Sequence, residues 1–228
     1  MNAVDESFRL TLTQSAAAMG VSLSETQTLA LLGYMALIQK WNKVYNLTAV
    51  RDASAMLTHH LLDSLAVIAP LREQLRAEQV LGEDVAKRVR LLDVGSGAGL
   101  PGVVIAIMCP GIQVDCVDTV AKKASFIQQV AVTLRLPNLR GVHARVESLT
   151  DKYQVVSSRA FASLVDFTSW SVNALAEQGV WMGMKGKHPA DEMAALPASV
   201  AVFHVEQLDV PGLGAERCIV WMRPAVAG

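Results

Sequence analysis

Apolar positions in the first third of the chain recur at three- and four-residue steps, which is the period of an amphipathic helix. One stripe consists of Leu31, Met35, Ile38, Trp41 and Tyr45. The residues Ser24–Gln27 read SETQ, a capping-box pattern that predicts the start of this helix. A shorter helix is predicted at 5–19, and a third from the N-cap Asp52 to Ala69, where Pro70 should end it. We therefore expect the first third of the chain to be helical.

From residue 89 onward, short apolar runs alternate with helical patterns. Strands are predicted at 89–94, 112–117, 141–144, 153–157 and 179–184, and helices at 101–108, 121–135 and 164–176. This alternation predicts βαβ units and a mostly parallel sheet. Two later runs, 199–207 and 216–223, are joined by Pro211–Gly214 and predict an antiparallel hairpin at the sheet edge. The expected fold is α/β, Rossmann-like, with an N-terminal helical extension.

A polar stretch separates the helical first third from the alternating strands and helices that follow. Glu78–Arg90 carries Gly82 and three basic residues, as linkers between elements commonly do. We expect the helical extension to occupy 1–80 and the Rossmann-like domain to occupy 81–228.

Composition agrees with this fold and excludes some classes of protein. Of the 228 residues 52% are hydrophobic but only 5% are aromatic, as expected for aliphatic helices around a parallel sheet. The longest apolar run, Val103–Cys109, is far shorter than the ~20 residues that span a bilayer, so no membrane span is expected. Three cysteines without a Cys-x-x-Cys pair, and acidic Asp5 and Glu6 near the start, favour the cytoplasm. A net charge of −1 lacks the positive balance that is typical of nucleic-acid-binding proteins.

The stretch 91–103, LLDVGSGAGLPGV, contains two overlapping glycine patterns. In one, Asp93 is followed by the alternate glycines Gly95, Gly97 and Gly99; the other, ending at Gly102, formally matches the dinucleotide fingerprint. Glycines at these positions let the backbone turn tightly and approach a ligand closely, because no Cβ intervenes. The loop therefore predicts a nucleotide-like ligand at the end of the first strand.

Two residues favour S-adenosylmethionine over a dinucleotide. Pro101 removes one of the helix N-terminal amides that would bind a pyrophosphate. Asp93 would repel a diphosphate but suits the sulfonium and ammonium of S-adenosyl-L-methionine. Asp118, which ends the second predicted strand, can accept both ribose hydroxyls, or it can cap the next helix. Gly102 is then interpreted as allowing close packing of helix against strand.

Four segments, in order and spacing, carry a family resemblance. They are Trp41–Thr48 (WNKVYNLT), Asp93–Gly102 (DVGSGAGLPG), Ser158–Ala162 (SRAFA) and Met184–Gly186 (MKG). Over about residues 25 to 223 the chain resembles the glucose-inhibited division protein B family, also called RsmG. The resemblance implies a class I S-adenosylmethionine-dependent methyltransferase fold and methyl transfer from S-adenosylmethionine to N7 of a guanosine in 16S rRNA, guanosine 527 of the 530 loop. It places cofactor contacts on Gly95, Leu100, Val146, Glu147 and Arg159.

The segment after the fourth predicted strand agrees with N7 chemistry. Guanine N7 has an in-plane lone pair and no proton, so its methylation needs an in-line approach and no general base. Ser157–Phe161 lacks the Asn-Pro-Pro-Tyr-like sequence of enzymes that methylate exocyclic amines. We therefore expect no catalytic base. Arg159 is expected to position the cofactor carboxylate, guanine O6 or a phosphate, unless it pairs with a nearby acidic residue.

Other basic and polar residues are expected to contact RNA. Substrate contacts are predicted at Asn46, Lys185 and Lys187, in addition to Arg159. Local positive surface is predicted from Lys122, Lys123, Arg135, Arg140 and Arg145. His60 and Asp63 lie one helical turn apart and could pair locally, and no metal site is expected.

The predicted partner is 16S rRNA within a 30S subunit or assembly particle, bound by a monomer. Two alternatives remain open, a small-molecule methyltransferase and a non-catalytic RNA-binding module. A pocket closed over by the first three helices would favour the small-molecule enzyme.

Overall fold

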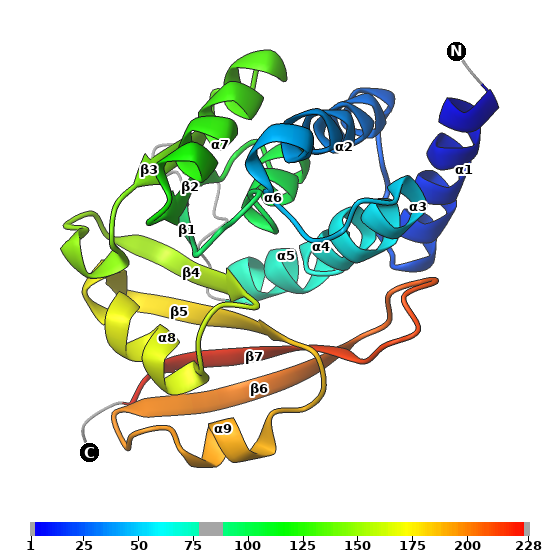
Figure 1. Ribbon diagram of the computed structural model, residues 1–228. Coiled ribbons are helices and arrows are strands. Elements are labelled where there is room, and N and C mark those ends of the chain that lie inside the picture. The colour runs from blue at the N-terminus through cyan, green and yellow to red at the C-terminus, as the bar shows by residue number, and fades with distance from the viewer. Residues whose placement is uncertain (1–2, 78–88, 226–228) are drawn as a thin grey trace.

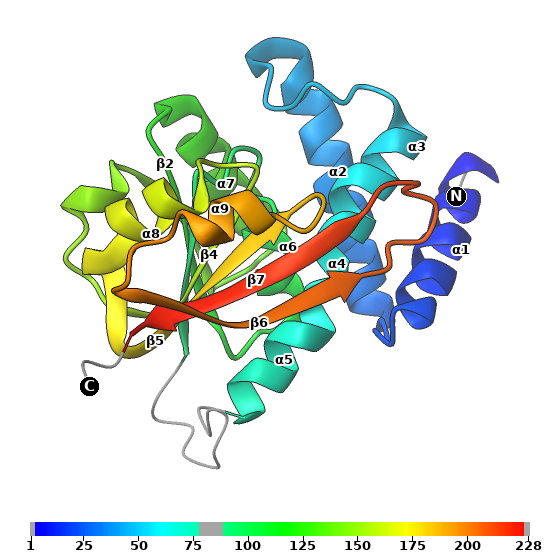
Figure 2. The same ribbon diagram turned by 90° about the horizontal axis from the view of Figure 1, so that it is seen from below.

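The computed structural model describes residues 3–77 and 89–225. Within these ranges a seven-stranded sheet has the order β3-β2-β1-β4-β5-β7-β6 and carries helices on both faces (Figure 1). The strands are β1 (Arg90–Val94), β2 (Gln113–Asp118), β3 (Leu139–His143), β4 (Tyr153–Arg159), β5 (Leu175–Lys185), β6 (Val200–Leu208) and β7 (Arg217–Pro224). The first five are parallel, and β7 pairs antiparallel with both β5 and β6. The predicted parallel sheet with an antiparallel hairpin at its edge is confirmed, and Figure 2 shows that hairpin running the length of the molecule.

The N-terminal third is helical, as predicted. Its elements are α1 (Ala3–Ala18), α2 (Glu25–Tyr45), α3 (Ala53–Met56), the π-helix η1 (Leu57–Leu62), α4 (Asp63–Leu65) and α5 (Ile68–Ala77). The capping box of α2 is confirmed: the Gln27 amide donates to Ser24 Oγ at 3.2 Å, and the Ser24 amide donates to Gln27 Oε1 at 3.0 Å. The Asp52 side chain caps α3 by accepting from the Ala55 amide at 2.8 Å. Local capping chemistry therefore sets both helix starts.

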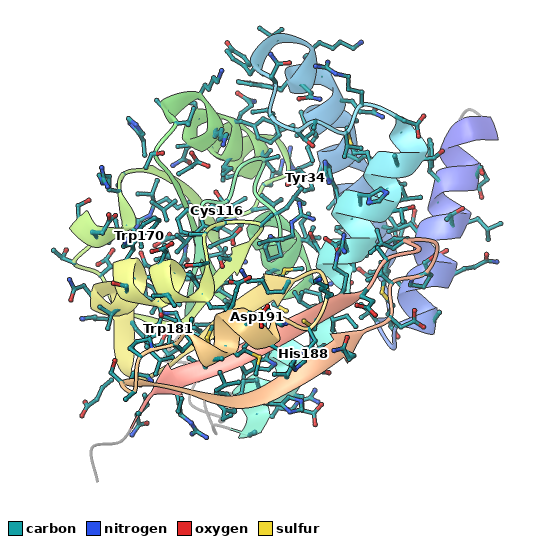
Figure 3. The ribbon with its side chains drawn as sticks, turned by 60° about the horizontal axis from the view of Figure 1, so that its bottom comes forward. Tyr34, Cys116, Trp170, Trp181, His188 and Asp191 are labelled. Atoms are coloured by element: carbon teal, nitrogen blue, oxygen red, sulfur yellow. The ribbon has the colours of Figure 1, made fainter. Side chains whose placement is uncertain are left out.

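The apolar stripe of α2 is buried along most of its length. Leu31, Met35 and Ile38 are buried and Trp41 packs against the core, but Tyr45 is 38% exposed. The buried stripe thus ends before the last turn of the helix. Tyr34, which the stripe did not include, is fully buried, and Figure 3 shows it beside the helical layer inside the molecule.

The prediction that Pro70 ends the third helix is wrong. A turn at 66–67 breaks the helical run, and Pro70 then lies in the first turn of α5, which continues to Ala77. Proline is tolerated there because an amide in the first helical turn has no intrahelical acceptor to lose. The run is also interrupted by η1, which no local pattern indicated.

The remaining elements are α6 (Gly102–Met108), α7 (Ala121–Thr133), the 3-10 turn η2 (Val146–Ser148), α8 (Leu164–Ser171), the 3-10 turn η3 (Val172–Ala174) and α9 (Ala190–Ala194). Four predicted boundaries are wrong by two to five residues. The helix predicted at 164–176 ends at Ser171, so β5 begins four residues early. Strand β3 begins two residues early, and β4 runs two residues further, to Arg159.

Two hydrophobic clusters cover the two faces of the sheet. The larger joins side chains of the N-terminal helices to those of α6, α7 and one sheet face, and the smaller lies under α8. The larger cluster is one continuous core, with Tyr34 of α2, Leu61 of η1 and Ile127 of α7 among its members. The extension is therefore packed on the sheet; its predicted limit at residue 80 lies outside the described residues, as does most of the predicted linker. In the described ranges, no helix is long and apolar enough to cross a membrane.

Candidate functional site

The glycine loop lies where β1 sits between β2 and β4, the point of the sheet at which the strand order reverses. The amides of Gly95 and Ser96 donate to the Val117 carbonyl at 3.0 and 3.2 Å. The Gly97 amide donates to Asp118 Oδ2 at 3.0 Å. Because Gly95 and Gly97 have φ values of +64° and +60°, residues with a Cβ would be strained there. The loop is thus fixed against the carboxyl end of β2, where a sheet of this type binds its ligand.

Asp93 is fully buried behind the loop. Its carboxylate accepts from the Gly102 amide at 2.9 Å and from Ser157 Oγ at 3.1 Å. Burial raises the pKa of this carboxyl to about 7. A Cβ on Gly102 would lie 2.4 Å from Cys116 Sγ and 2.9 Å from Asp93 Oδ2. The close packing predicted for Gly102 is confirmed, and Asp93 holds the start of α6; its contact with a sulfonium stays a prediction.

The end of the loop is also occupied by packing contacts. A Cβ on Gly99 would lie 2.5 Å from Val103 Cγ2. Tyr34 donates its hydroxyl to the Ala98 carbonyl at 2.6 Å, and Leu100 is buried. The loop is therefore held from below by α2, a contact across 64 residues of sequence that the sequence did not indicate.

A cavity of about 690 Å³, here called the first cavity, opens beside the loop. Its lining includes Gly95, Asp118, Val146, Glu147, Phe161 and Trp170. Four of the nine predicted cofactor contacts thus come together at the carboxyl ends of β1, β2 and β3. The volume lies within the range of small-molecule and cofactor sites, about 300–1,000 Å³.

The two carboxylates of this cavity differ in how they are held. Asp118 is buried and accepts from the Val120 amide at 2.9 Å and from Lys123 Nζ at 3.4 Å, in addition to Gly97. It therefore shapes both the loop and the start of α7, close to the capping role that the sequence left open. Glu147 is exposed, and its pKa is lowered by a hydrogen bond with its own backbone and by Arg145, whose guanidinium lies 3.2 Å away.

Two aromatic side chains that line the first cavity were not predicted from the sequence. Phe161 and Trp170 meet edge to face, with ring centroids 5.7 Å apart. The Phe161 ring covers Gly95 so closely that a Cβ there would lie 2.3 Å from its Cδ2. Phe161 was visible as part of the SRAFA segment, but nothing in the sequence placed it over the glycine loop.

Arg159 faces a second cavity of about 390 Å³, which shares Ala160 with the first. Its Nη1 donates to Asp63 Oδ2 at 2.7 Å and to the His59 carbonyl at 2.9 Å. The ion pair that the sequence left as an alternative is therefore present. Arg159 does not line the first cavity, so its predicted cofactor contact stays a prediction.

The local pair that the spacing of His60 and Asp63 allowed is replaced by other partners. His60 Nε2 lies 2.8 Å from Thr48 Oγ1, while Asp63 Oδ1 accepts from Arg217 Nε at 2.7 Å. Burial is the main cause that lowers the pKa of His60. The described residues contain no group of three potential ligands that could hold a metal ion.

The predicted RNA contacts are dispersed. Lys185 lines the second cavity and pairs with Glu192 at 2.7 Å. Lys187 is exposed on the following turn. Asn46 is the left-handed C-cap of α2, and its side chain accepts from Arg51 at 3.0 Å. Only Arg159 and Lys185 of the four lie on one cavity.

The basic residues predicted to give local positive surface do not all lie together. Lys123 and Arg145 line the first cavity. Arg140 lies at the amino end of β3, where it pairs with Asp115 at 2.7 Å and Asp151 at 3.4 Å. Arg140 and Arg145 are close in sequence but lie at opposite ends of β3, so their side chains are separated by the length of the strand.

Similarity to solved structures supports the fold. Coclaurine N-methyltransferase bound to N-methylheliamine and SAH superposes with a TM-score of 0.54 at 12% identity, covering 90% of this chain and 73% of that one. TrmN from Thermus thermophilus gives a TM-score of 0.53 at 17% identity, covering 74% of this chain and 53% of that one. Together with the strand order, they show the class I S-adenosylmethionine-dependent methyltransferase fold predicted from the sequence.

Sequence relatives are much closer. Ribosomal RNA small subunit methyltransferase G of Acidovorax sp. (strain JS42) is 65% identical over 220 residues, 96% of each chain. The protein of the same name from Albidiferax ferrireducens is 70% identical over 203 residues, 88% of this chain and 90% of the other. Residues 27–220 match the family model described as rRNA small subunit methyltransferase G. The glycine loop, the two adjoining cavities and this full-length similarity agree: the chain belongs to the rRNA small subunit methyltransferase G family.

Proposed function

We propose that the chain transfers the methyl group of S-adenosylmethionine to N7 of a guanosine in 16S rRNA of the small ribosomal subunit. The observation that carries this proposal is the pair of adjoining cavities, one beside the glycine loop and one lined by cationic side chains. A transferase for two substrates needs two such sites in contact. Family membership supports the substrate class.

The first cavity fits S-adenosylmethionine. Gly95 presents backbone without a Cβ, Asp118 offers a carboxylate near the end of β2, and Val146 and Glu147 lie at the end of β3. These positions suit, in order, the methionine part, the ribose hydroxyls and the adenine edge. When bound there, the cofactor supplies an electrophilic methyl group. Gly97, Gly99, Leu100 and Asp93 support the loop from behind.

The second cavity suits the acceptor nucleotide. Arg159, Lys185 and Arg217 bring three positive charges to its wall; the carboxylate of Asp63 also lines it, and Lys185 is paired with Glu192. A guanidinium can bind a phosphate or guanine O6 bidentately. Because N7 carries no proton, the chain needs to orient the base and to exclude water, and no side chain has to remove a proton. In this proposal Arg159, which lines the second cavity next to Ala160, orients the acceptor.

The finer features of the substrate are part of the same proposal. The acceptor is guanosine 527 of the 530 loop, presented within a 30S subunit or an assembly particle in the cytoplasm, and the enzyme acts as a monomer. Asn46, Lys185 and Lys187 contact the RNA around it. The small positive surface and the net charge of −1 favour recognition of a structured particle over strong binding to naked RNA.

The small-molecule alternative is less well supported. The helical extension does contribute Val50, His59, His60 and Asp63 to the second cavity, but the family model and the full-length relatives are named for ribosomal RNA. A module without catalytic activity would not need the cavity to adjoin a cationic one.

The test uses 30S particles from a strain that lacks this modification. Purified protein and S-adenosylmethionine should produce N7-methylguanosine in 16S rRNA, detected by mass spectrometry, and faster on particles than on naked 16S rRNA. Arg159→Ala should bind the cofactor in isothermal titration but lose at least about tenfold in kcat/KM. A wild-type protein that binds S-adenosylmethionine but leaves the rRNA unmodified would refute the proposed reaction.

A further inference from the structure

A buried carboxylate of the helical extension lies between two arginines of the sheet. Asp63, on α4, is 2% exposed. Its Oδ2 accepts from Arg159 Nη1 at 2.7 Å and its Oδ1 from Arg217 Nε at 2.7 Å. Arg159 ends β4 and Arg217 begins β7, so one side chain connects three elements that are distant in sequence.

The hydrogen bonds of Arg159 leave part of its guanidinium available. Nη1 is engaged by Asp63 and the His59 carbonyl. Within residues 3–77 and 89–225, no partner is found for Nε or Nη2, and the side chain borders the second cavity. Because a guanidinium is planar, fixing one nitrogen at two acceptors also fixes the direction of the other donors.

Burial makes this arrangement persistent. A carboxylate taken out of water needs both of its oxygens hydrogen-bonded, and each arginine here satisfies one of them. Two positive charges against one negative leave the group positive, which suits an anionic acceptor.

We infer that Asp63 is a positioning residue: it holds the Arg159 guanidinium so that Nε and Nη2 face the acceptor nucleotide in the second cavity. The inference rests on the proposed function of that cavity. It also gives the N-terminal helices a role in the reaction, because they deliver Asp63 to the site.

Asp115 on β2, nearer the opposite end of the parallel strands, offers a matched control. Asp115 is 1% exposed and pairs with Arg140 at 2.7 Å and Arg90 at 3.3 Å. It is likewise a buried aspartate between two arginines, but it lies at the amino ends of the strands, away from both cavities. Asp115→Asn therefore reports what losing such a charge does to folding alone.

The experiment compares Asp63→Asn with Asp115→Asn for Tm, cofactor Kd, and kcat and KM on 30S particles lacking the modification, assayed well below the lower Tm. Both variants should lose stability. Asp63→Asn should lower kcat by about tenfold or more while its cofactor Kd stays within about twofold, and Asp115→Asn should keep kcat within about twofold. Equal kcat values for the two variants would overturn the inference.

A double-mutant cycle separates positioning from an independent effect. If Asp63 acts through Arg159, then Asp63→Asn should cause no further loss of kcat in the Arg159→Ala background, whereas additive losses would contradict the inference. Should Asp63→Asn not fold, Asp63→Glu keeps the charge but moves the guanidinium by one methylene. A wild-type kcat in that variant would equally overturn the role of Asp63, without touching the reaction itself.

Discussion

Replacing Asp93 by asparagine should remove a pH-dependent loss of stability. The carboxyl is fully buried at the end of β1, and burial raises its pKa from 3.8 to about 7. Hydrogen bonds from the Gly102 amide and Ser157 Oγ act in the opposite direction, but desolvation is the larger effect. The folded protein thus holds this proton more tightly than the unfolded chain does.

The sign follows from proton linkage. Between pH 3.8 and about 7 the folded state binds more protons at Asp93 than the unfolded state, so the free energy of unfolding falls as pH rises. At 1.36 kcal/mol for each pKa unit, this shift corresponds to about 4 kcal/mol. The loss is absent below pH 3.8 and complete above pH 7.

Asparagine preserves the local hydrogen bonds without the charge. Its amide oxygen can accept from Gly102, and its NH2 can donate to Ser157 Oγ, which lies 3.3 Å from the Leu92 carbonyl and can donate there. Urea unfolding of both proteins at about pH 4, 6 and 8 isolates the effect, because all other titrating groups cancel in the difference. The stability of Asp93→Asn relative to wild type should rise by about 4 kcal/mol across this range. A difference that does not change with pH would refute the reasoning.

Three further predictions concern contacts that shape the site. Gly102→Ala should destabilise the protein by about 1–3 kcal/mol, because its Cβ would overlap Cys116 Sγ; a gain of stability in urea unfolding, as alanine gives in a free helix, would contradict the packing. Tyr34→Phe should lower the free energy of unfolding by about 1 kcal/mol, since the Ala98 carbonyl loses its donor, and it should weaken cofactor binding in isothermal titration. Unchanged binding would show that the contact from α2 does not support the loop. Ser24→Ala should cost about 1 kcal/mol through the lost cap, seen as a lower Tm with unchanged kcat; an altered kcat would contradict a purely structural cap.

Features encoded by neighbouring residues could be predicted from the sequence alone. The capping box at Ser24 depends on one residue three positions away, and the alternation of strands and helices depends on hydrophobic period. The glycine loop predicted a nucleotide-like ligand because alternate glycines act through local backbone geometry, whereas the partners of Asp93, the Gly102 amide and Ser157 Oγ, were visible only in the structure. Boundaries such as the early start of β5 were missed, since the pairing of Leu175 with Tyr153 of β4 extends the strand beyond its apolar run.

Contacts between distant residues were decided only by the tertiary structure. From the sequence, Asp63 had His60 as its near neighbour, yet it pairs with Arg159 and Arg217, 96 and 154 residues away. The sequence grouped Arg140 with Arg145, but Arg140 lies near the amino end of β3 and Arg145 lies beyond its carboxyl end. Sequence patterns report which residues a position can reach along its own helix or strand. Which charges share a buried site depends on how the helical extension packs on the sheet. A buried carboxylate has lost its hydration, so it is stable only when the fold brings hydrogen-bond donors to both of its oxygens.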